Sequence, residues 1–147
     1  MEQELHDEIR GVVTDVLDKG GATWTAFAEA GLLSLSMPED LDGAGLGAQA
    51  QRVVLAEAGA RCVDVPIWPT LTAGALPLAS QGLADLMAAV SAGSHFLVPA
   101  LSEPQHALPS QPTASVRDGK VSGTKTGVVL AGIEGSFTYV VSVSGPE

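Results

Sequence analysis

The start of the chain has the hydrophobic spacing of an amphipathic helix. Apolar residues recur every three or four positions, as one stripe of a helix with about 3.6 residues per turn, at Leu5, Ile9, Val12, Val13, Val16 and Leu17. Most acidic residues of this segment lie off that stripe, so one face suits a core and the other suits water. Gly20 and Gly21 follow directly, and they end the predicted helix.

A second, shorter helix is predicted next, and an irregular loop follows it. Thr23 is suited to cap a helix that runs to Ala30, and Gly31 stands where a C-terminal cap is expected. Residues 32–46 contain Pro38 and glycines that prevent a helix from continuing. This segment therefore predicts a loop between two helices.

Three further helical segments are predicted at residues 48–60, 70–80 and 83–92, the second with a kink at Pro77. The glycine-rich residues 43–47 precede the first of them and superficially resemble a phosphate-binding loop. They follow a helix and a loop rather than a strand, so we interpret them as a turn into the helix.

From His95 onward the pattern changes to that of strands. Residues 96–98 are a short apolar run, and runs rich in Val and Thr occupy residues 113–116, 120–130 and 136–143. Asp118-Gly119 is a good hairpin turn signal. Helices followed by strands, without alternation, predict an α+β fold. We expect an all-α helical bundle over residues 1–94 and the first antiparallel strands of a β domain over residues 95–147.

Charge and cysteine content narrow the function classes. The chain has 17 acidic and 7 basic residues, a net charge of -10 that opposes binding to nucleic acid or to anionic membrane surfaces. Cys62 is the single cysteine, which excludes an intrachain disulfide and fits a reducing, cytoplasmic location. The N-terminus is acidic, unlike a signal peptide, and prolines interrupt the most apolar stretch, residues 65–78, which excludes a continuous membrane helix there.

The residues alone predict neither a metal site nor a catalytic centre. His6, His95 and His106 are far apart, and no paired cysteines or metal-binding His motif accompany them. Adjacent carboxylates lie on polar faces, where solvated charge is the ordinary interpretation. We therefore assign no catalytic residue and no metal ligand to this chain.

Four local phrases in a fixed order carry a family resemblance. Residues 26–47, AFAEAGLLSLSMPEDLDGAGLG, resemble the segment LAE-G-GL-GL-VPE--GG-G of the acyl-CoA dehydrogenase family, and residues 54–61, VLAEAGAR, resemble its VLEELGR helix. Residues 99–104, PALSEP, resemble its A-TEP turn, and residues 118–125, DGKVSGTK, resemble its DGY-LNGTK hairpin. Each phrase is weak alone, but the four together cover nearly the whole chain in the family's order.

The resemblance implies an N-terminal helical domain and the opening strands of a β-barrel-like middle domain. In this family a C-terminal four-helix domain follows, and we expect it to be absent from this chain. That domain supplies the catalytic glutamate, much of the adenine-side contact to FAD and the oligomer interface. The resemblance thus agrees with the expectation that no catalytic residue lies in this chain.

The resemblance also implies candidate cofactor contacts. Ser102 matches the threonine of TEP, which contacts the flavin ring, so Leu101 and Ser102 are expected to bind FAD. As an alternative, Ser102 is simply a turn residue. Val128 and Val129 lie in the segment that covers the flavin in the family, and they are candidate contacts as well.

Two departures from the family pattern bear on the flavin site. The family's G-GSD turn is replaced by Gln105-His106-Ala107-Leu108-Pro109-Ser110. The tryptophan and threonine of its WIT phrase are replaced by Gly127 and Val129. An aromatic wall and a hydroxyl donor are therefore both missing from the expected flavin site.

Two functions follow from the resemblance. The first is FAD-dependent α,β-dehydrogenation of an acyl-CoA in fatty-acid or sterol catabolism, in a homo- or hetero-oligomer, with electron-transfer flavoprotein as acceptor. In this reaction a carboxylate removes the α-proton and the β-hydride passes to the flavin. The alternative is a non-catalytic partner subunit of a heteromeric acyl-CoA dehydrogenase, with a degraded flavin site. A stand-alone helical binding module is disfavoured, because it leaves the β segment without a role.

Overall fold

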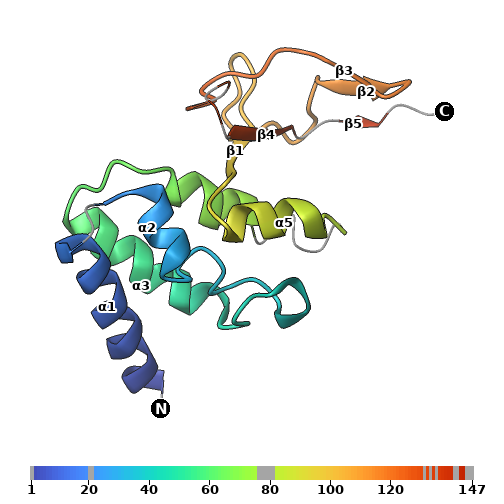
Figure 1. Cartoon of the computed structure of the whole chain (residues 1–147). Helices are drawn as coiled ribbons and strands as arrows, with labels where there is room; N and C mark the ends of the chain where they lie inside the picture. Colours follow the sequence, from blue (N-terminus) through green and yellow to red (C-terminus); the bar gives the residue numbers. More distant parts are fainter. Residues whose placement is uncertain are drawn as a thin grey trace.

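A block of helices carries a smaller layer of strands, and the first strand runs between the two (Figure 1). The computed structural model describes residues 2–19, 22–75, 82–130, 132, 134, 136–140 and 143–144. The helical elements are α1 (Glu2–Lys19), α2 (Trp24–Glu29), the short 3-10 helix η1 (Glu39–Leu41), α3 (Gly47–Ala60), the π-helix η2 (Pro69–Ala75) and α5 (Ala84–Ser91). The strands are β1 (Phe96–Ala100), β2 (Ser115–Arg117), β3 (Lys120–Ser122), β4 (Ser136–Val140) and β5 (Val143–Ser144).

The predicted helix caps are confirmed. The Oγ1 atom of Thr23 accepts a hydrogen bond from the backbone N–H of Ala26 at 3.2 Å, which satisfies one free donor at the start of α2. Gly31 follows α2 with a φ of 71°, a conformation that glycine adopts without strain. α1 ends at Lys19, and the predicted stop at residues 20–21 lies outside the described residues.

The loop before α3 depends on a close backbone approach. A Cβ atom added at Gly43 would lie 2.1 Å from the carbonyl oxygen of Met37, so only glycine fits this position. Gly45 and Gly47 have φ values of 63° and 69°, and α3 begins at Gly47. The glycine-rich segment is therefore a turn into a helix, as predicted.

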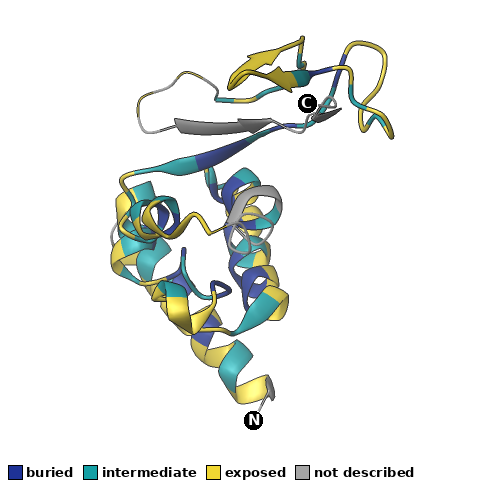
Figure 2. Ribbon diagram, turned by 90° about the vertical axis from the view of Figure 1, so that its right-hand side faces the viewer, coloured by how far each residue is buried: buried dark blue, intermediate teal, exposed yellow. Residues whose placement is uncertain are grey.

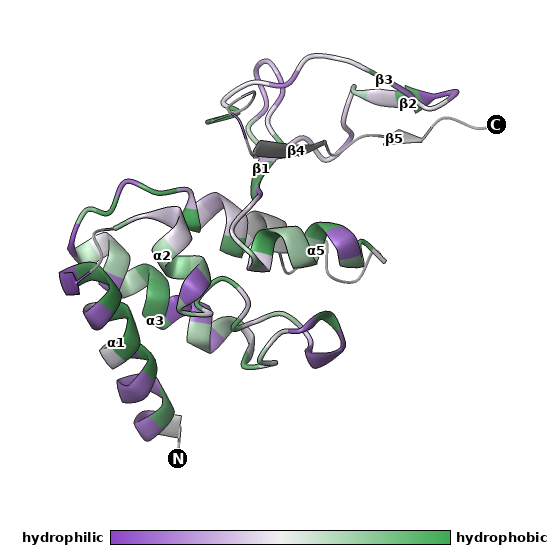
Figure 3. Cartoon of the chain, in the orientation of Figure 1, coloured by the Kyte–Doolittle hydropathy of each residue, from purple (hydrophilic) through white to green (hydrophobic). Residues whose placement is uncertain are grey.

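One apolar core holds the helices together. The buried side chains come from α1, α2, the following loop, α3, the approach to η2 and η2 itself: Ile9, Val13, Phe27, Leu32, Leu33, Ala50, Val53, Val54, Ala58, Ile67 and Leu71. Figure 2 shows these buried segments facing one another across the helical block. Figure 3 shows the apolar stripe of α1 along the side that faces α3, the helix against which it packs. The periodicity of residues 5–17 therefore marks the face that is buried.

A second, smaller cluster joins the helices to the first strand. Met37, Met87, Val90 and Leu97 are buried together and come from the loop after α2, from α5 and from β1. Thr70 of η2 is also buried, and its Oγ1 accepts a hydrogen bond from the N–H of Leu97 at 3.1 Å. Packing and hydrogen bonding thus anchor β1 on the helical block.

The α+β class is confirmed, and among the strands that the structure describes only one of the three pairings is antiparallel. β2 and β3 form the predicted hairpin, with positive φ values of 49° and 69° at Asp118 and Gly119. β1 pairs with β4 in parallel, and so does β2 with β5, so the expectation of antiparallel strands was wrong for these pairs. Long connections separate both pairs, and a long connection allows the parallel orientation that a tight turn forbids.

Several predicted boundaries also need correction. The strand expected over residues 120–130 ends at Ser122, because Gly123 has a φ of 148° and its missing Cβ would lie 2.7 Å from the Cα atom of Ala114. The run 113–116 becomes the strand Ser115–Arg117, since the backbone N–H groups of Thr113 and Ala114 bind a carboxylate instead.

The helical segment expected over residues 70–80 is the π-helix Pro69–Ala75 in its described part. The predicted kink at Pro77 lies outside the described residues. The division into domains at residues 94 and 95 stays a prediction; α5 ends at Ser91 and β1 begins at Phe96.

Candidate functional site

A buried ion pair joins two of the sequence phrases that carry the resemblance. Glu103 follows β1, and Lys125 follows β3, 22 residues further along the chain. The Nζ atom of Lys125 lies 2.9 Å from Oε1 of Glu103, and the two side chains are only 8% and 3% exposed. Because both charges are removed from water, each depends on the other and on further hydrogen bonds.

The remaining hydrogen-bonding capacity of the Glu103 carboxylate is satisfied by the start of the hairpin. Oε2 accepts from Thr113 Oγ1 at 2.6 Å and from Thr113 N at 2.8 Å, and Oε1 accepts from Ala114 N at 3.1 Å. These donors stabilise the charged form, the Thr113 hydroxyl first and Lys125 next, and they lower the pKa of Glu103 from 4.5 to about 2. Glu103 is therefore an ionised structural anchor at neutral pH rather than a proton acceptor.

The same lysine places the loop that follows it. Lys125 Nζ also donates to the carbonyl oxygen of Leu101 at 3.2 Å, and the N–H of the next residue, Thr126, donates to the carbonyl oxygen of Ser102 at 2.9 Å. The segment 101–103 and the segment 125–126 are thus held side by side. The loop of residues 126–130 leaves from this fixed point.

The turn after Glu103 is tight. Glu103 and His106 exchange two backbone hydrogen bonds of 2.8 and 2.9 Å, with Pro104 and Gln105 between them. Gln105 has a φ of 70°, at a turn position where glycine is favoured. This is the start of the segment that differs from the family's glycine-containing turn.

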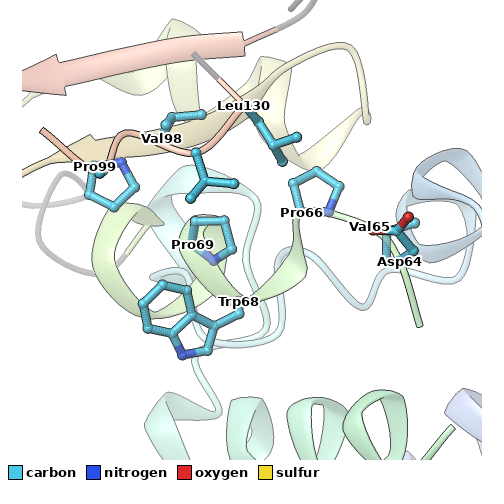
Figure 4. A pocket seen from close by; sticks show the side chains of 10 residues that line it. Asp64, Val65, Pro66, Trp68, Pro69, Val98, Pro99 and Leu130 are labelled. Carbon is cyan, nitrogen blue, oxygen red and sulfur yellow. The ribbon is translucent and has the colours of Figure 1, made fainter. Parts of the chain in front are cut away.

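The loop 126–130 forms one wall of an apolar pocket of about 450 Å³, which we name the Pro66 pocket (Figure 4). The connection between α3 and η2 forms the opposite wall, and β1 contributes two residues. The lining residues are Asp64, Val65, Pro66, Trp68, Pro69, Val98, Pro99, Gly127, Val129 and Leu130. Trp68 is 65% exposed and Val129 is 68% exposed, so the pocket is open to an incoming group.

The candidate cofactor residues fall into two places. Val129 lines the Pro66 pocket, whereas Val128 is half-buried and is not part of its lining. Leu101 and Ser102 lie at the base of the loop, and the Ser102 hydroxyl donates to the carbonyl oxygen of Ala107 at 2.7 Å. A turn residue ordinarily makes such a bond. Because the hydroxyl donates in it, the Ser102 Oγ atom can still accept a hydrogen bond.

Sequence reasoning missed the roles of Glu103, Lys125 and Trp68. Both charged residues stand inside the phrases SEP and GTK, so a signal was present: an acidic and a basic side chain retained in two matching motifs. Trp68 gave no comparable signal, because a tryptophan in a proline-rich connection is equally consistent with a core position.

The pocket fits a flat, largely apolar group. Its volume lies within the range of small-molecule sites, and Gly127 leaves open space where a side chain would stand. Asp64 is the charged residue of its lining, and no lysine or arginine lines it. The lining therefore suits a ring system and offers no cation to a diphosphate.

Two other kinds of site are absent from the described parts of the chain. Among these residues no three His, Cys, Asp or Glu side chains gather as metal ligands. No helix in the described ranges is long and apolar enough to cross a membrane.

The helical part of the chain matches a known protein family. The model of the acyl-CoA dehydrogenase N-terminal domain matches residues 2–89. The chain belongs to the acyl-CoA dehydrogenase family. It is 36% identical over 127 residues to acyl-CoA dehydrogenase FadE28 of Mycobacterium tuberculosis, an alignment that covers 84% of this chain and 37% of that protein.

Solved structures agree with this assignment. A variant of the Tcur3481-Tcur3483 steroid ACAD superposes with a TM-score of 0.79 and 32% identity, over 98% of this chain and 46% of that one. The ChsE4-ChsE5 complex from Mycobacterium tuberculosis superposes with a TM-score of 0.65 and 24% identity, over 82% of this chain and 39% of that one, and shares the fold. The chain thus spans less than half the length of the relatives that it matches.

Proposed function

We propose that this chain is part of a subunit of a heteromeric acyl-CoA dehydrogenase, acting in FAD-dependent α,β-dehydrogenation of an acyl-CoA in fatty-acid or sterol catabolism. The observation that carries the proposal is the superposition of 98% of the chain on a steroid ACAD of two components. The Pro66 pocket supports it, since it lies beside the loop that corresponds to the flavin-covering segment of the family.

In this proposal the chain's own residues bind and orient. The Glu103–Lys125 ion pair holds the loop 126–130 in place, and the prolines of the pocket exclude water from one side of a bound ring. A bound flavin would accept the β-hydride of the substrate. No described residue is assigned as the base.

The alternative is a non-catalytic subunit that completes a partner's active site. It is favoured by the lining of the Pro66 pocket, where Gly127 and Val129 replace an aromatic residue and a hydroxyl donor of the family. A Cβ atom added at Gly127 would meet nothing within 4 Å, so this wall is open. A cytoplasmic location and transfer of electrons to electron-transfer flavoprotein remain predictions for both functions.

Flavin content distinguishes the two functions. The chain is purified alone and after co-expression with a second acyl-CoA dehydrogenase subunit, and the FAD bound per chain is measured from its visible absorbance. We expect FAD to be retained with the partner, together with reduction of an artificial acceptor by an acyl-CoA. Stoichiometric FAD on the chain alone would exclude the non-catalytic alternative. A stable complex without FAD or dehydrogenation would refute the catalytic proposal.

A matched pair of variants tests the role of the pocket wall. Val129→Thr restores a hydroxyl at a residue that lines the Pro66 pocket, and Val128→Thr places the same change beside it, outside the lining. If the wall contacts the flavin, V129T raises FAD occupancy and V128T leaves it unchanged. Equal effects of the two variants would contradict contact between this wall and the cofactor.

A further inference from the structure

The hairpin of β2 and β3 has two chemically different faces. Its strands pair in register, and the three opposite pairs are Ser115 with Ser122, Val116 with Val121, and Arg117 with Lys120. Because side chains alternate between the two faces of a strand, both valines lie on one face, and the serines and the cations lie on the other. We name the second of these the Arg117 face; its residues are Ser115, Arg117, Lys120 and Ser122. Both cations are exposed, and Figure 2 shows the exposed strands of this hairpin.

The two cations of the Arg117 face have no carboxylate partner. The chain has seven lysine and arginine residues. Carboxylates of the described residues form ion pairs with Arg10, Lys19, Arg61 and Lys125, and with neither cation of the hairpin. Like charges directly opposite each other on neighbouring strands are destabilising. The hairpin therefore keeps two adjacent positive charges at a cost in stability, in a chain whose net charge is -10.

The chemical groups on this face are those that bind phosphate. Guanidinium and ammonium groups donate charge-assisted hydrogen bonds to phosphate oxygens, and serine hydroxyls donate to the same oxygens. Opposite side chains of a hairpin start about 5 Å apart, so donors from both strands can reach one phosphate. The tight turn at Asp118 and Gly119, with φ values of 49° and 69°, holds the two strands in register before a ligand binds. The Arg117 face thus suits a phosphate group.

The Pro66 pocket makes no provision for phosphate. Its lining contains Asp64 and no lysine or arginine, so it suits a ring and repels a diphosphate. Acyl-CoA and FAD, the ligands of the proposed function, both carry an adenosine diphosphate, and CoA carries a further phosphate on its ribose. Among the described residues, the other cation without a carboxylate partner is Arg52 of α3, whose Nε atom donates to Gln49. Within the described chain, two such cations therefore lie together only on the Arg117 face.

We propose that the Arg117 face binds a phosphate group of an adenine nucleotide, the chemistry that CoA and FAD share. Arg117 and Lys120 bind the phosphate from opposite strands, and the serine hydroxyls donate to its remaining oxygens. The net charge of -10 opposes the approach of long polyanions, so a small nucleotide fits this face better than a nucleic acid does. This proposal deepens the proposed function, on which it rests for the identity of the natural ligand.

Nuclear magnetic resonance titrations of the full chain test the proposal, with CoA, 3′-dephospho-CoA, FAD and inorganic phosphate as probes. The backbone amide signals of residues 115–122 report binding at the hairpin. Arg117→Gln and Lys120→Gln each remove one positive charge from the face, whereas Arg117→Lys keeps the charge. Arg52→Gln is the matched control, because it removes the same charge from a cation that also lacks a carboxylate partner.

We expect at least one nucleotide to shift these amide signals. R117Q and K120Q should each weaken its affinity about threefold, as for the loss of one exposed ion pair. R52Q should change the affinity by less than about 1.5-fold, and R117K should stay within about twofold of the original chain. Because exposed charges are screened by ions, the effect of R117Q should shrink when the salt concentration is raised.

The probes also identify the phosphate that is bound. A loss of affinity for CoA that is absent with 3′-dephospho-CoA assigns the ribose phosphate. Equal losses for these two probes assign the diphosphate of CoA. A response to FAD alone assigns the diphosphate of the flavin cofactor.

Other outcomes overturn the proposal. Amide signals that no nucleotide shifts, equal responses to nucleotides and inorganic phosphate, or equal effects of R52Q and R117Q would each show that the face is not a nucleotide site. If R117Q weakened only the complex with a second acyl-CoA dehydrogenase subunit, the cations would bind a protein instead. Binding is measured without turnover, so a negative result leaves the test of dehydrogenation unaffected. Nucleotide binding by a chain whose complex shows no dehydrogenation would refute the proposed function alone.

Discussion

Replacing Thr70 by valine tests how the first strand is attached to the helical block. Thr70 is fully buried in η2, and its Oγ1 accepts from the N–H of Leu97 at 3.1 Å and donates to the carbonyl oxygen of Leu97 at 3.4 Å. Both backbone groups of one strand residue point to the same side. The threonine hydroxyl thus stands in for a strand partner on the side of β1 away from β4.

The cost of T70V follows from this geometry. Valine keeps the shape, so the change removes two hydrogen bonds and leaves the buried N–H and carbonyl of Leu97 unpaired. A buried group without a partner costs about 1–3 kcal/mol, and the longer bond contributes less because of its length. We expect a loss of about 2 kcal/mol in the free energy of unfolding. At roughly 2–4 °C per kcal/mol, the melting temperature falls by about 4–8 °C.

Urea unfolding followed by far-UV circular dichroism measures this loss, with an unchanged m value as the sign that the native state is intact. Thr70→Ser is the control, because it keeps the hydroxyl and removes one methyl group, at a cost of about 0.8 kcal/mol. If T70V were as stable as the unmodified chain, or if T70S were the less stable variant, methyl packing rather than the hydrogen bonds would attach β1.

Three further predictions concern the site and its supports. Glu103 has a pKa lowered to about 2, so its contribution to stability is present above about pH 4.5 and is lost as the pH falls toward 2. In E103Q the melting temperature should therefore fall less between pH 4.5 and pH 2 than in the original chain. An equal fall of the melting temperature in both proteins would contradict the role of the ion pair. Gln105→Gly should raise stability by about 1 kcal/mol in urea unfolding, because the residue has a φ of 70°, and a decrease would mean that the glutamine side chain is needed. Gly43→Ala should lower the free energy of unfolding by about 1–3 kcal/mol, because the added Cβ atom would lie 2.1 Å from the Met37 carbonyl oxygen. A free energy of unfolding within about 0.5 kcal/mol of the original value would show that the loop shifts to make room.

Part of the candidate site was predictable from the sequence. Val129 was a candidate because of its place after the GTK phrase, and it lines the Pro66 pocket. The pocket itself was not predictable, since residues 64–69 form its other wall about 60 positions earlier in the chain. No local sequence pattern predicts that residues 64–69 and the loop 126–130 lie together in the folded chain.

The anchoring role of Glu103 was hidden for a related reason. Motif comparison matches residues along the chain, whereas the function of Glu103 lies in the groups around its carboxylate, the N–H groups of Thr113 and Ala114 and the ammonium of Lys125. These contacts also explain why β2 begins at Ser115 and not at residue 113 as predicted, because the N–H groups of residues 113 and 114 bind the carboxylate. Here a long-range contact overrode a local strand preference.

The elements with local causes could be predicted from the sequence alone. Helical periodicity, the cap at Thr23, the turn before α3 and the Asp118-Gly119 hairpin each depend on residues within a few positions of one another. The order of phrases likewise sufficed for the family. Only the folded chain shows the parallel pairing of β1 with β4, the burial of the Glu103–Lys125 pair and the Pro66 pocket. These features depend on segments that meet only after the chain has folded, because the free energy of burial and pairing depends on distance in space rather than along the chain.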